Sequence, residues 1–303
     1  MSIFTPRPAS YARHYQESPQ IVEADGARTW ITRGANFVIA ITEAKLGTVL
    51  ARTGHPDEYM IVLPPDVTGE VVAGEDRCAV EGDSLIIVPP GDSALTVTKA
   101  GTVLRVFSSR PADLTSVASN AAVYASGDSV AAPLQDWPAP VDGFRLHVHR
   151  LCDYGTPGGP LIQPRIFRST NLMINAFLPW HTLRPADDMR PHWHDDFEQA
   201  SVALEGRWVH HVRMPWNSDV TTWREDEHET LESPSVAIIP ETLVHATTNA
   251  GEGRAWLIDV FAPPRLDFAK AGIVLNGADY PMPEAKDGIE EERDVPLAWR
   301  KKG

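Results

Sequence analysis

One short segment concentrates residue types that bind metal ions. The sequence RPHWHDDFEQ, residues 190–199, contains His192, His194 and Glu198 in a chain that has eleven histidines. In an extended strand, residues two apart point to the same side, so both imidazoles would face one space. We expect Glu198 to add a carboxylate oxygen and His245 to arrive from a second segment. Three neutral imidazoles and a carboxylate suit a divalent Fe, Mn, Ni, Zn or Cu ion and leave positions open for water or substrate.

A second segment could bring acid–base groups to the same place. RWVHHVRMPW, residues 207–216, predicts a strand in which only one of His210 and His211 faces inward. If His211 faces inward, so does Arg213. We then expect His211 to act as an acid or base beside the metal and Arg213 to pair with a substrate carboxylate. The alternative is a surface histidine pair with an arginine in a salt bridge.

The residues that follow Glu198 predict the lining of the site. Gln199 would point away from the metal in a regular strand, and we leave it out of the site. Ala200, Val202 and Leu204 share the face of Glu198 in that strand and would form an apolar lining for a small organic molecule.

A weak internal repeat organises the elements that must position these residues. GDSLIIVPPGDSA in the first half aligns with SPSVAIIPETLVH in the second, so that Ala94 meets His245. DEYMIVL aligns with FEQASVAL, which superposes Glu58 on Glu198. Both halves contain short apolar runs separated by Gly, Pro and Asp turns, without long amphipathic helical periodicity. The pattern predicts an all-β protein with two similar halves.

Two motifs in the second half resemble those of a known family. HWHDDFEQASVALEG resembles the first motif of the cupins, and PETLVHATTN resembles the second. The resemblance covers residues 36–268 and implies two tandem cupin barrels of the jelly-roll type, a bicupin. Ala186, Pro234 and Thr242 stand where cupins usually have glycines, and the spacing from Glu198 to Gly206 is one residue longer than is usual in the family. We expect these departures to affect turns rather than ligands. The alternative, a solvated acid-rich turn, is weakened because four ligand types occur at the family's spacing in two separate motifs.

The repeat and the composition also predict the domain boundaries. We expect an N-terminal barrel over residues 1–113, a connector rich in Ala, Ser and Pro over 114–145, a metal-binding barrel over 146–275 and a polar tail over 276–303. The N-terminal barrel should lack a metal, because GHPDEY offers only His55 and Glu58 and because alanine replaces the last histidine. We expect it to serve packing, within the chain or across a homodimer.

Composition excludes several classes of partner. The chain has 303 residues, 43% of them hydrophobic, and a formal net charge of -14. This charge argues against nucleic acid, whose phosphates are bound by clustered Lys and Arg. The sequence contains no run of eighteen apolar residues, and its N-terminus lacks the layout of a secretory signal, so we expect no membrane partner and a cytoplasmic location.

Three functions compete. The resemblance to cupin dioxygenases favours Fe(II) held by His192, His194, Glu198 and His245, with an organic substrate and dioxygen at the open positions. The alternative is a non-redox isomerase, hydrolase or lyase acting on a sugar acid or similar anion, with Mn(II), Ni(II) or Zn(II) as Lewis acid. The third is a small-ligand-binding or regulatory bicupin, although no DNA-binding segment is evident.

Overall fold

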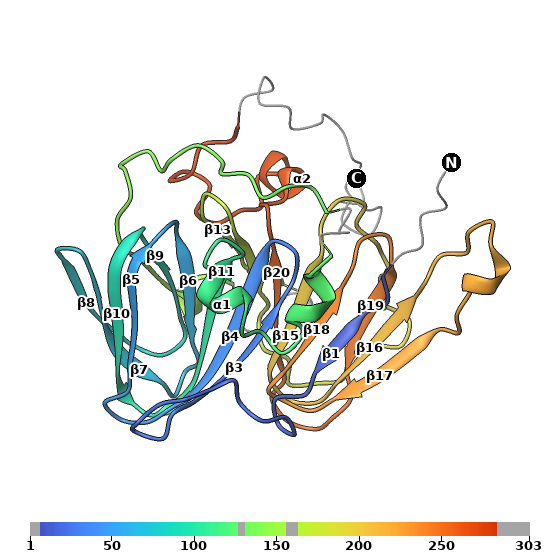
Figure 1. The fold of residues 1–303 in the computed structure, drawn as a ribbon, viewed down its shortest axis with the longest axis horizontal. Coiled ribbons are helices and arrows are strands. Elements are labelled where there is room, and N and C mark those ends of the chain that lie inside the picture. Colours follow the sequence, from blue (N-terminus) through green and yellow to red (C-terminus); the bar gives the residue numbers. More distant parts are fainter. Residues whose placement is uncertain (1–6, 127–130, 156–162, 284–303) are drawn as a thin grey trace.

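The regular secondary structure of the protein consists almost entirely of antiparallel strands. The computed structural model describes residues 7–126, 131–155 and 163–283. Two halves lie side by side, each with two sheets that face each other (Figure 1). The all-β expectation is confirmed. No helix in the described ranges is both long and apolar enough to cross a lipid bilayer.

The first half pairs a seven-stranded sheet with a four-stranded one. The large sheet has the order β12-β9-β6-β11-β4-β3-β2 and the small sheet has the order β5-β10-β7-β8. The large sheet consists of β2 (Ile21–Val22), β3 (Arg28–Arg33), β4 (Phe37–Ala44), β6 (Tyr59–Leu63), β9 (Ser84–Val88), β11 (Gly101–Ser108) and β12 (His147–Arg150). The small sheet consists of β5 (Val49–His55), β7 (Thr68–Ala73), β8 (Asp76–Val80) and β10 (Gly91–Lys99).

The second half repeats this plan with fewer strands. Its large sheet has the order β1-β18-β15-β20-β14-β13, and its small sheet has the order β17-β16-β19. The large sheet consists of β1 (Ser10–Ala12), β13 (Ile166–Arg168), β14 (Met173–Ala176), β15 (Gln199–Glu205), β18 (Ser235–Ile239) and β20 (Trp256–Phe261). The small sheet consists of β16 (Trp208–Arg213), β17 (Glu227–Leu231) and β19 (Val244–Asn249).

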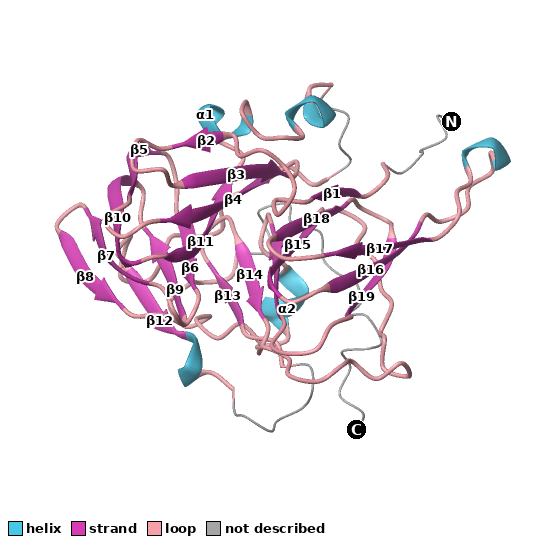
Figure 2. Ribbon diagram, turned by 90° about the horizontal axis from the view of Figure 1, so that it is seen from below, coloured by secondary structure: helices cyan, strands magenta, loops and turns pink. Residues whose placement is uncertain are grey.

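Helices are few and short, and they lie in the connections. They are α1 (Ala112–Thr115), η1 (Ala121–Tyr124), η2 (Leu151–Asp153), η3 (Val220–Thr222) and α2 (Leu266–Lys270). Viewed from below, η3 sits at the tip of a long connection between β16 and β17 that projects from the second half (Figure 2).

Each half contributes a strand to the other. Strand β1, near the N-terminus, pairs with β18 of the second half, and Tyr11 lies opposite Ala237. Strand β12, which follows the connector, pairs with β9 of the first half. In Figure 1 the blue β1 lies among the yellow and orange strands. The predicted boundaries at 113 and 146 therefore do not separate two independent barrels, because residues 10–12 and 147–150 lie in the opposite halves.

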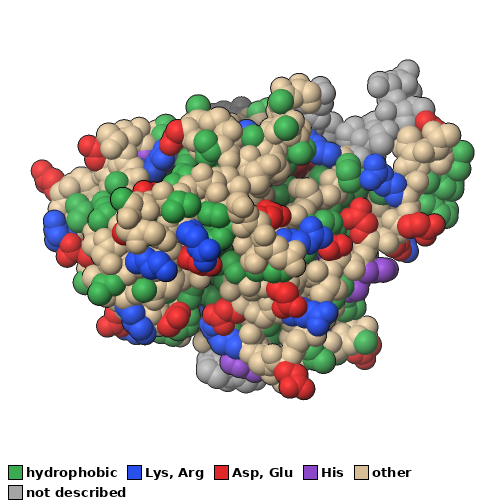
Figure 3. Space-filling view, turned by 60° about the horizontal axis from the view of Figure 1, so that its bottom comes forward, with side chains coloured by type: hydrophobic (Ala, Val, Ile, Leu, Met, Phe, Trp, Pro, Cys, Tyr) green, Lys and Arg blue, Asp and Glu red, His purple; other side chains and the backbone are tan. Residues whose placement is uncertain are grey.

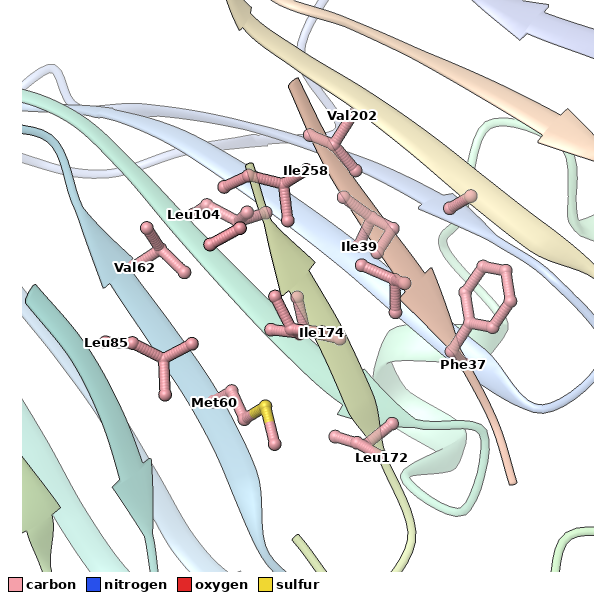
Figure 4. Packing of buried hydrophobic residues seen from close by; sticks show 14 of the residues in the cluster. Phe37, Ile39, Met60, Val62, Leu85, Leu104, Leu172, Ile174, Val202 and Ile258 are labelled. Carbon is pink, nitrogen blue, oxygen red and sulfur yellow. The ribbon is translucent and has the colours of Figure 1, made fainter. Parts of the chain in front are cut away.

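The two large sheets pack face to face and form the main core. Phe37, Ile39 and Met60 of the first half lie against Ile174 and other apolar residues of the second (Figure 4). These sheets are buried on both faces, which explains runs such as SLIIV and SVAII in which every residue is buried. The small outer sheet of the first half alternates instead, as in TGEVVA, because one of its faces meets solvent.

The ends of the predicted domains are more buried than the sequence suggests. Trp137 of the connector is buried, and Arg168 stacks on its ring. The predicted polar tail begins with Asn276 and Tyr280, which are also buried, while residues 284–303 lie outside the described ranges. On the face shown in Figure 3, positive and negative side chains are interspersed rather than gathered by sign.

Candidate metal centre

The three predicted histidines meet inside the second half. His192 forms an isolated bridge with His245, in which each backbone amide donates to the other residue's carbonyl at 3.1 and 2.8 Å. His194 follows in a loop rather than in the strand that we expected. Its carbonyl accepts a hydrogen bond from the Thr242 amide, so the two cupin-like motifs are joined by their backbones.

The imidazoles are arranged to present nitrogen lone pairs to one point. One ring nitrogen from each of His192, His194 and His245 lies within 4.8 Å of the others. The Nδ1 atoms of His192 and His245 donate to the carbonyls of Arg190 and Leu243, which leaves their Nε2 atoms as acceptors. The Nε2 atom of His245 is buried and has no hydrogen-bond partner among the described residues. These donors fit a divalent ion.

Burial keeps the three imidazoles neutral. Desolvation is the largest cause that lowers the pKa of His192 to about 4 and that of His245 to about 3, and the nearby Arg265 guanidinium acts in the same direction. The same causes hold the pKa of His194 well below its usual range. Neutral imidazoles are the form that binds metal.

Glu198 does not join the histidines, and the predicted fourth ligand is wrong in this structure. Its buried carboxylate points to the other half of the molecule. There it accepts hydrogen bonds from the Ala35 amide at 2.5 Å and the Tyr124 hydroxyl at 3.2 Å. The guanidinium of Arg7 forms an ion pair with Glu198, with 3.5 Å between Nη1 of Arg7 and Oε1 of Glu198.

The internal repeat explains the position of Glu198. Glu58, its counterpart in the first half, is buried at the same kind of place and accepts hydrogen bonds from the amide and hydroxyl of Thr170, both at 2.9 Å. The Tyr280 hydroxyl donates to it at 2.8 Å. Each half therefore offers one buried glutamate to a loop of the other half. The repeat marks an interface carboxylate rather than a metal ligand.

Gln199, which we had excluded, is the residue that faces the histidines. Its Oε1 atom lies 2.9 Å from Nε2 of His194, and its Nε2 atom donates to Ser201 at 3.0 Å. Ser201 in turn donates to Asp259 at 2.7 Å. The alternation of polar residues 199 and 201 with apolar neighbours is the sequence signal for this inward face.

The residues on the opposite face of β15 do not line the site. Ala200, Val202 and Leu204 share the face of Glu198 as expected, but this face belongs to the core between the halves. The apolar lining predicted from them is therefore wrong. The alternation along the strand was correct, and only the assignment of its faces was reversed.

A pocket opens beside His192 and His245. Its wall is largely aromatic and aliphatic, and its polar groups include three arginines, Arg184, Arg190 and Arg265, which were not predicted from the sequence. Arg265 is buried, ion-paired with Asp267, and stacked 3.7 Å from the centre of the Phe268 ring. Arg184 is half-buried and donates to the Thr247 carbonyl at 2.9 Å. The apolar lining includes Phe177, Leu178, Trp180, Trp208, Leu257 and Phe261.

Asp259 is the acidic group of this pocket. It lines the cavity and is half-buried. Burial raises its pKa to about 7, although Ser201 and Arg265 act in the opposite direction. The carboxyl can therefore gain or lose a proton near neutral pH.

The predicted catalytic pair lies on the outside of the barrel. His211 contacts His228 at an exposed position, with 2.7 Å between their Nδ1 atoms, and Arg213 pairs with Asp226. Both assignments are wrong in this structure, because β16 buries the alternate residues. His210 is the inward histidine, with its Nδ1 atom 3.2 Å from the Thr247 hydroxyl.

Comparison with known proteins identifies the architecture. No known family profile and no curated protein matches the sequence. Among solved structures, the chain is similar to Bacillus subtilis oxalate decarboxylase, studied for its Mn(II) centres, with a TM-score of 0.57 and 14% identity over 84% of this chain and 77% of that one. A Lactobacillus farciminis oxalate decarboxylase, solved as a formate complex, has a TM-score of 0.57 and 13% identity over 84% and 86% of the two chains.

The chain has a tandem cupin fold. The prediction of two jelly-roll barrels in one chain is therefore confirmed at the level of architecture. The comparisons give no support to the preference for Fe(II) and dioxygen, because the similar protein whose metal is named has Mn(II) centres. They do not test metal binding by the three histidines, the homodimer or the cellular location, which stay predictions.

Proposed function

We propose that this tandem cupin is a metal-dependent enzyme of the lyase type, which acts on a small carboxylate with an apolar or aromatic substituent. The observation that carries the proposal is the group of three neutral histidines beside a pocket that also contains three arginines, Arg184, Arg190 and Arg265. His192, His194 and His245 would hold one divalent ion, for which the similar oxalate decarboxylases favour Mn(II) over Fe(II). When bound, this ion would act as a Lewis acid on a substrate oxygen.

Two features of the pocket support a carboxylate substrate. Arg265 is buried and held in place by Asp267 and the Phe268 ring, so its guanidinium is oriented before a ligand arrives. Arg184 is fixed by two backbone carbonyls, those of Asp188 and Thr247. Two positioned guanidinium groups in an apolar pocket would bind and orient an organic anion.

Asp259 supports a reaction that ends in proton transfer. In a decarboxylation the bond to the carboxylate carbon breaks, CO₂ leaves, and the electron pair remains on the adjacent carbon, which must then receive a proton. Asp259 borders the pocket and carries a proton for part of the time at neutral pH, because burial raises its pKa to about 7. The aromatic wall around it would exclude competing water.

The oxidative reaction is the second candidate, and the apolar wall of the pocket favours it. Trp180, Trp208 and Phe261 form an apolar part of the wall that suits an aromatic or diketone substrate. Such chemistry would use Fe(II) and consume dioxygen. A binding protein without turnover is the third candidate.

The deciding experiment is metal analysis of protein purified without oxygen, followed by a substrate screen. Loaded with Mn(II), the protein should release CO₂ from one or more arylated or alkylated carboxylates without consuming dioxygen. Iron at one per chain with substrate-dependent oxygen uptake would establish the oxidative candidate. Ligand binding without any product would favour the binding protein, and absence of any bound metal would refute the metal-dependent proposal.

A further inference from the structure

We propose that the amide oxygen of Gln199 is the fourth protein donor of the metal centre, and that this uncharged ligand set binds its ion most tightly together with a small carboxylate. The inference rests on the proposed function, because it concerns the same ion. It differs from the sequence prediction in both the residue and the charge of the fourth ligand.

Hydrogen bonds fix the direction of the Gln199 amide. Its Nε2 atom donates to the Ser201 hydroxyl at 3.0 Å, and that hydroxyl donates to Asp259 at 2.7 Å. The Gln199 side chain also contacts Asp259 directly, where it stabilises the carboxylate form. A hydroxyl that gives its proton to Asp259 must accept from the amide, so the NH₂ group faces this pair. The amide oxygen consequently faces the histidines.

The position of this oxygen fits that of a metal ligand. It lies 2.9 Å from Nε2 of His194. Two donors that each bind an ion at about 2.1 Å and subtend a right angle are about 3.0 Å apart. The same contact is a hydrogen bond when His194 carries a proton on Nε2 and a pair of adjacent ligands when it does not. Gln199 is 3% exposed and His194 is 5% exposed, so water competes little for either atom.

The charge of this donor set has a consequence for binding. Three neutral imidazoles and an amide leave both positive charges of the ion uncompensated by its ligands, and the guanidinium of Arg265 adds another nearby. Glu198 cannot compensate them, because its carboxylate faces Ala35 and Tyr124 in the other half. Asp259 is held by the Ser201 hydroxyl and the Gln199 side chain. A buried, uncompensated charge is costly, so an anion that enters the pocket should stabilise the bound ion.

The test is a calorimetric titration of metal-free protein with Mn(II), with and without sodium formate, which serves as a small carboxylate that chelates weakly. We expect formate to increase the Mn(II) affinity of the unaltered protein by about tenfold or more. Gln199→Glu should bind Mn(II) about tenfold more tightly without formate and gain little from it, because the charge is already supplied. Gln199→Ala should bind about tenfold more weakly.

Glu198→Gln is the matched control, because it replaces a carboxylate by an amide at the residue next to Gln199, whereas Gln199→Glu replaces an amide by a carboxylate. It should leave the Mn(II) affinity and the formate effect unchanged. The Mn(II) EPR spectrum of the Gln199 variants should differ from that of the unaltered protein, which tests ligation without activity, and circular dichroism would show whether each variant is folded.

The outcomes separate this inference from the proposed function. Mn(II) binding that is equal in the unaltered protein and in folded Gln199→Ala would overturn the ligand assignment and leave a three-histidine enzyme intact. An affinity that formate does not change in the unaltered protein would overturn the anion coupling, whether or not the variants fold. If the unaltered protein binds neither Mn(II) nor a divalent Fe, Ni, Zn or Cu ion, both proposals are refuted.

Discussion

Replacing Glu198 by alanine should destabilise the protein without removing its metal. The substitution leaves the Ala35 amide and the Tyr124 hydroxyl without their acceptor and removes the partner of Arg7. A buried donor that loses its acceptor costs about 1–3 kcal/mol. Ala35 and Tyr124 are both half-buried, so we expect a total loss of about 2–3 kcal/mol in the free energy of unfolding. For a chain of this size that corresponds to a fall in Tm of about 4–12 °C.

The assay compares thermal unfolding with Mn(II) stoichiometry for the same preparations. Glu58→Ala is the matched control, because Glu58 is the counterpart in the first half and also accepts hydrogen bonds across the interface, from Thr170 and Tyr280. Both variants should lose stability to a similar extent and both should retain one Mn(II) per chain. The reasoning is refuted if folded Glu198→Ala keeps the Tm of the unaltered protein and loses its metal.

Three further predictions follow from the site and the fold. His245→Ala should abolish Mn(II) binding, whereas His55→Ala should leave it unchanged, because His55 packs against Tyr59 and Phe107 in the first half. Calorimetric titration with Mn(II) distinguishes the two variants. Loss of metal binding in both would contradict the assignment of the site to the second half. Burial lowers the pKa of His192 to about 4 and that of His245 to about 3, and it holds the pKa of His194 well below its usual range. The imidazoles therefore stay neutral as the pH falls below about 6.5, and Mn(II) affinity should hold down to about pH 5 and fall below it. A decline in Mn(II) affinity that begins near about pH 6.5 would show that the histidines titrate as ordinary ones. Deleting residues 1–12 removes strand β1, which pairs with the second half, and the Tyr11 hydrogen bond to Glu227. The Tm should therefore fall by about 5 °C or more. An unchanged Tm would show that the strand exchange contributes nothing to stability.

The pattern of β runs and turns was sufficient to predict the architecture. Short apolar segments separated by Gly, Pro and Asp have few alternatives to an antiparallel β fold. The repeat further indicated two similar halves. It could not show that β1 and β12 exchange between them, because strand pairing depends on which sheet edges are free once both halves have formed.

The sequence by itself also determined the three histidines of the site. The two motifs supply the residue types and their spacing, and the antiparallel bridge between residues 192 and 245 brings the two segments together in the folded chain. The tertiary structure alone decided between Glu198 and Gln199. Strand β15 is buried on both faces, so composition could not say which face meets the cavity and which meets the other half. Packing of the two large sheets decided which face of β15 meets the cavity. Glu198, Ala200, Val202 and Leu204 point at the first half, where they complete the shared core and, in the case of Glu198, accept a hydrogen bond from it. Gln199, on the opposite face, is thereby turned toward the histidines.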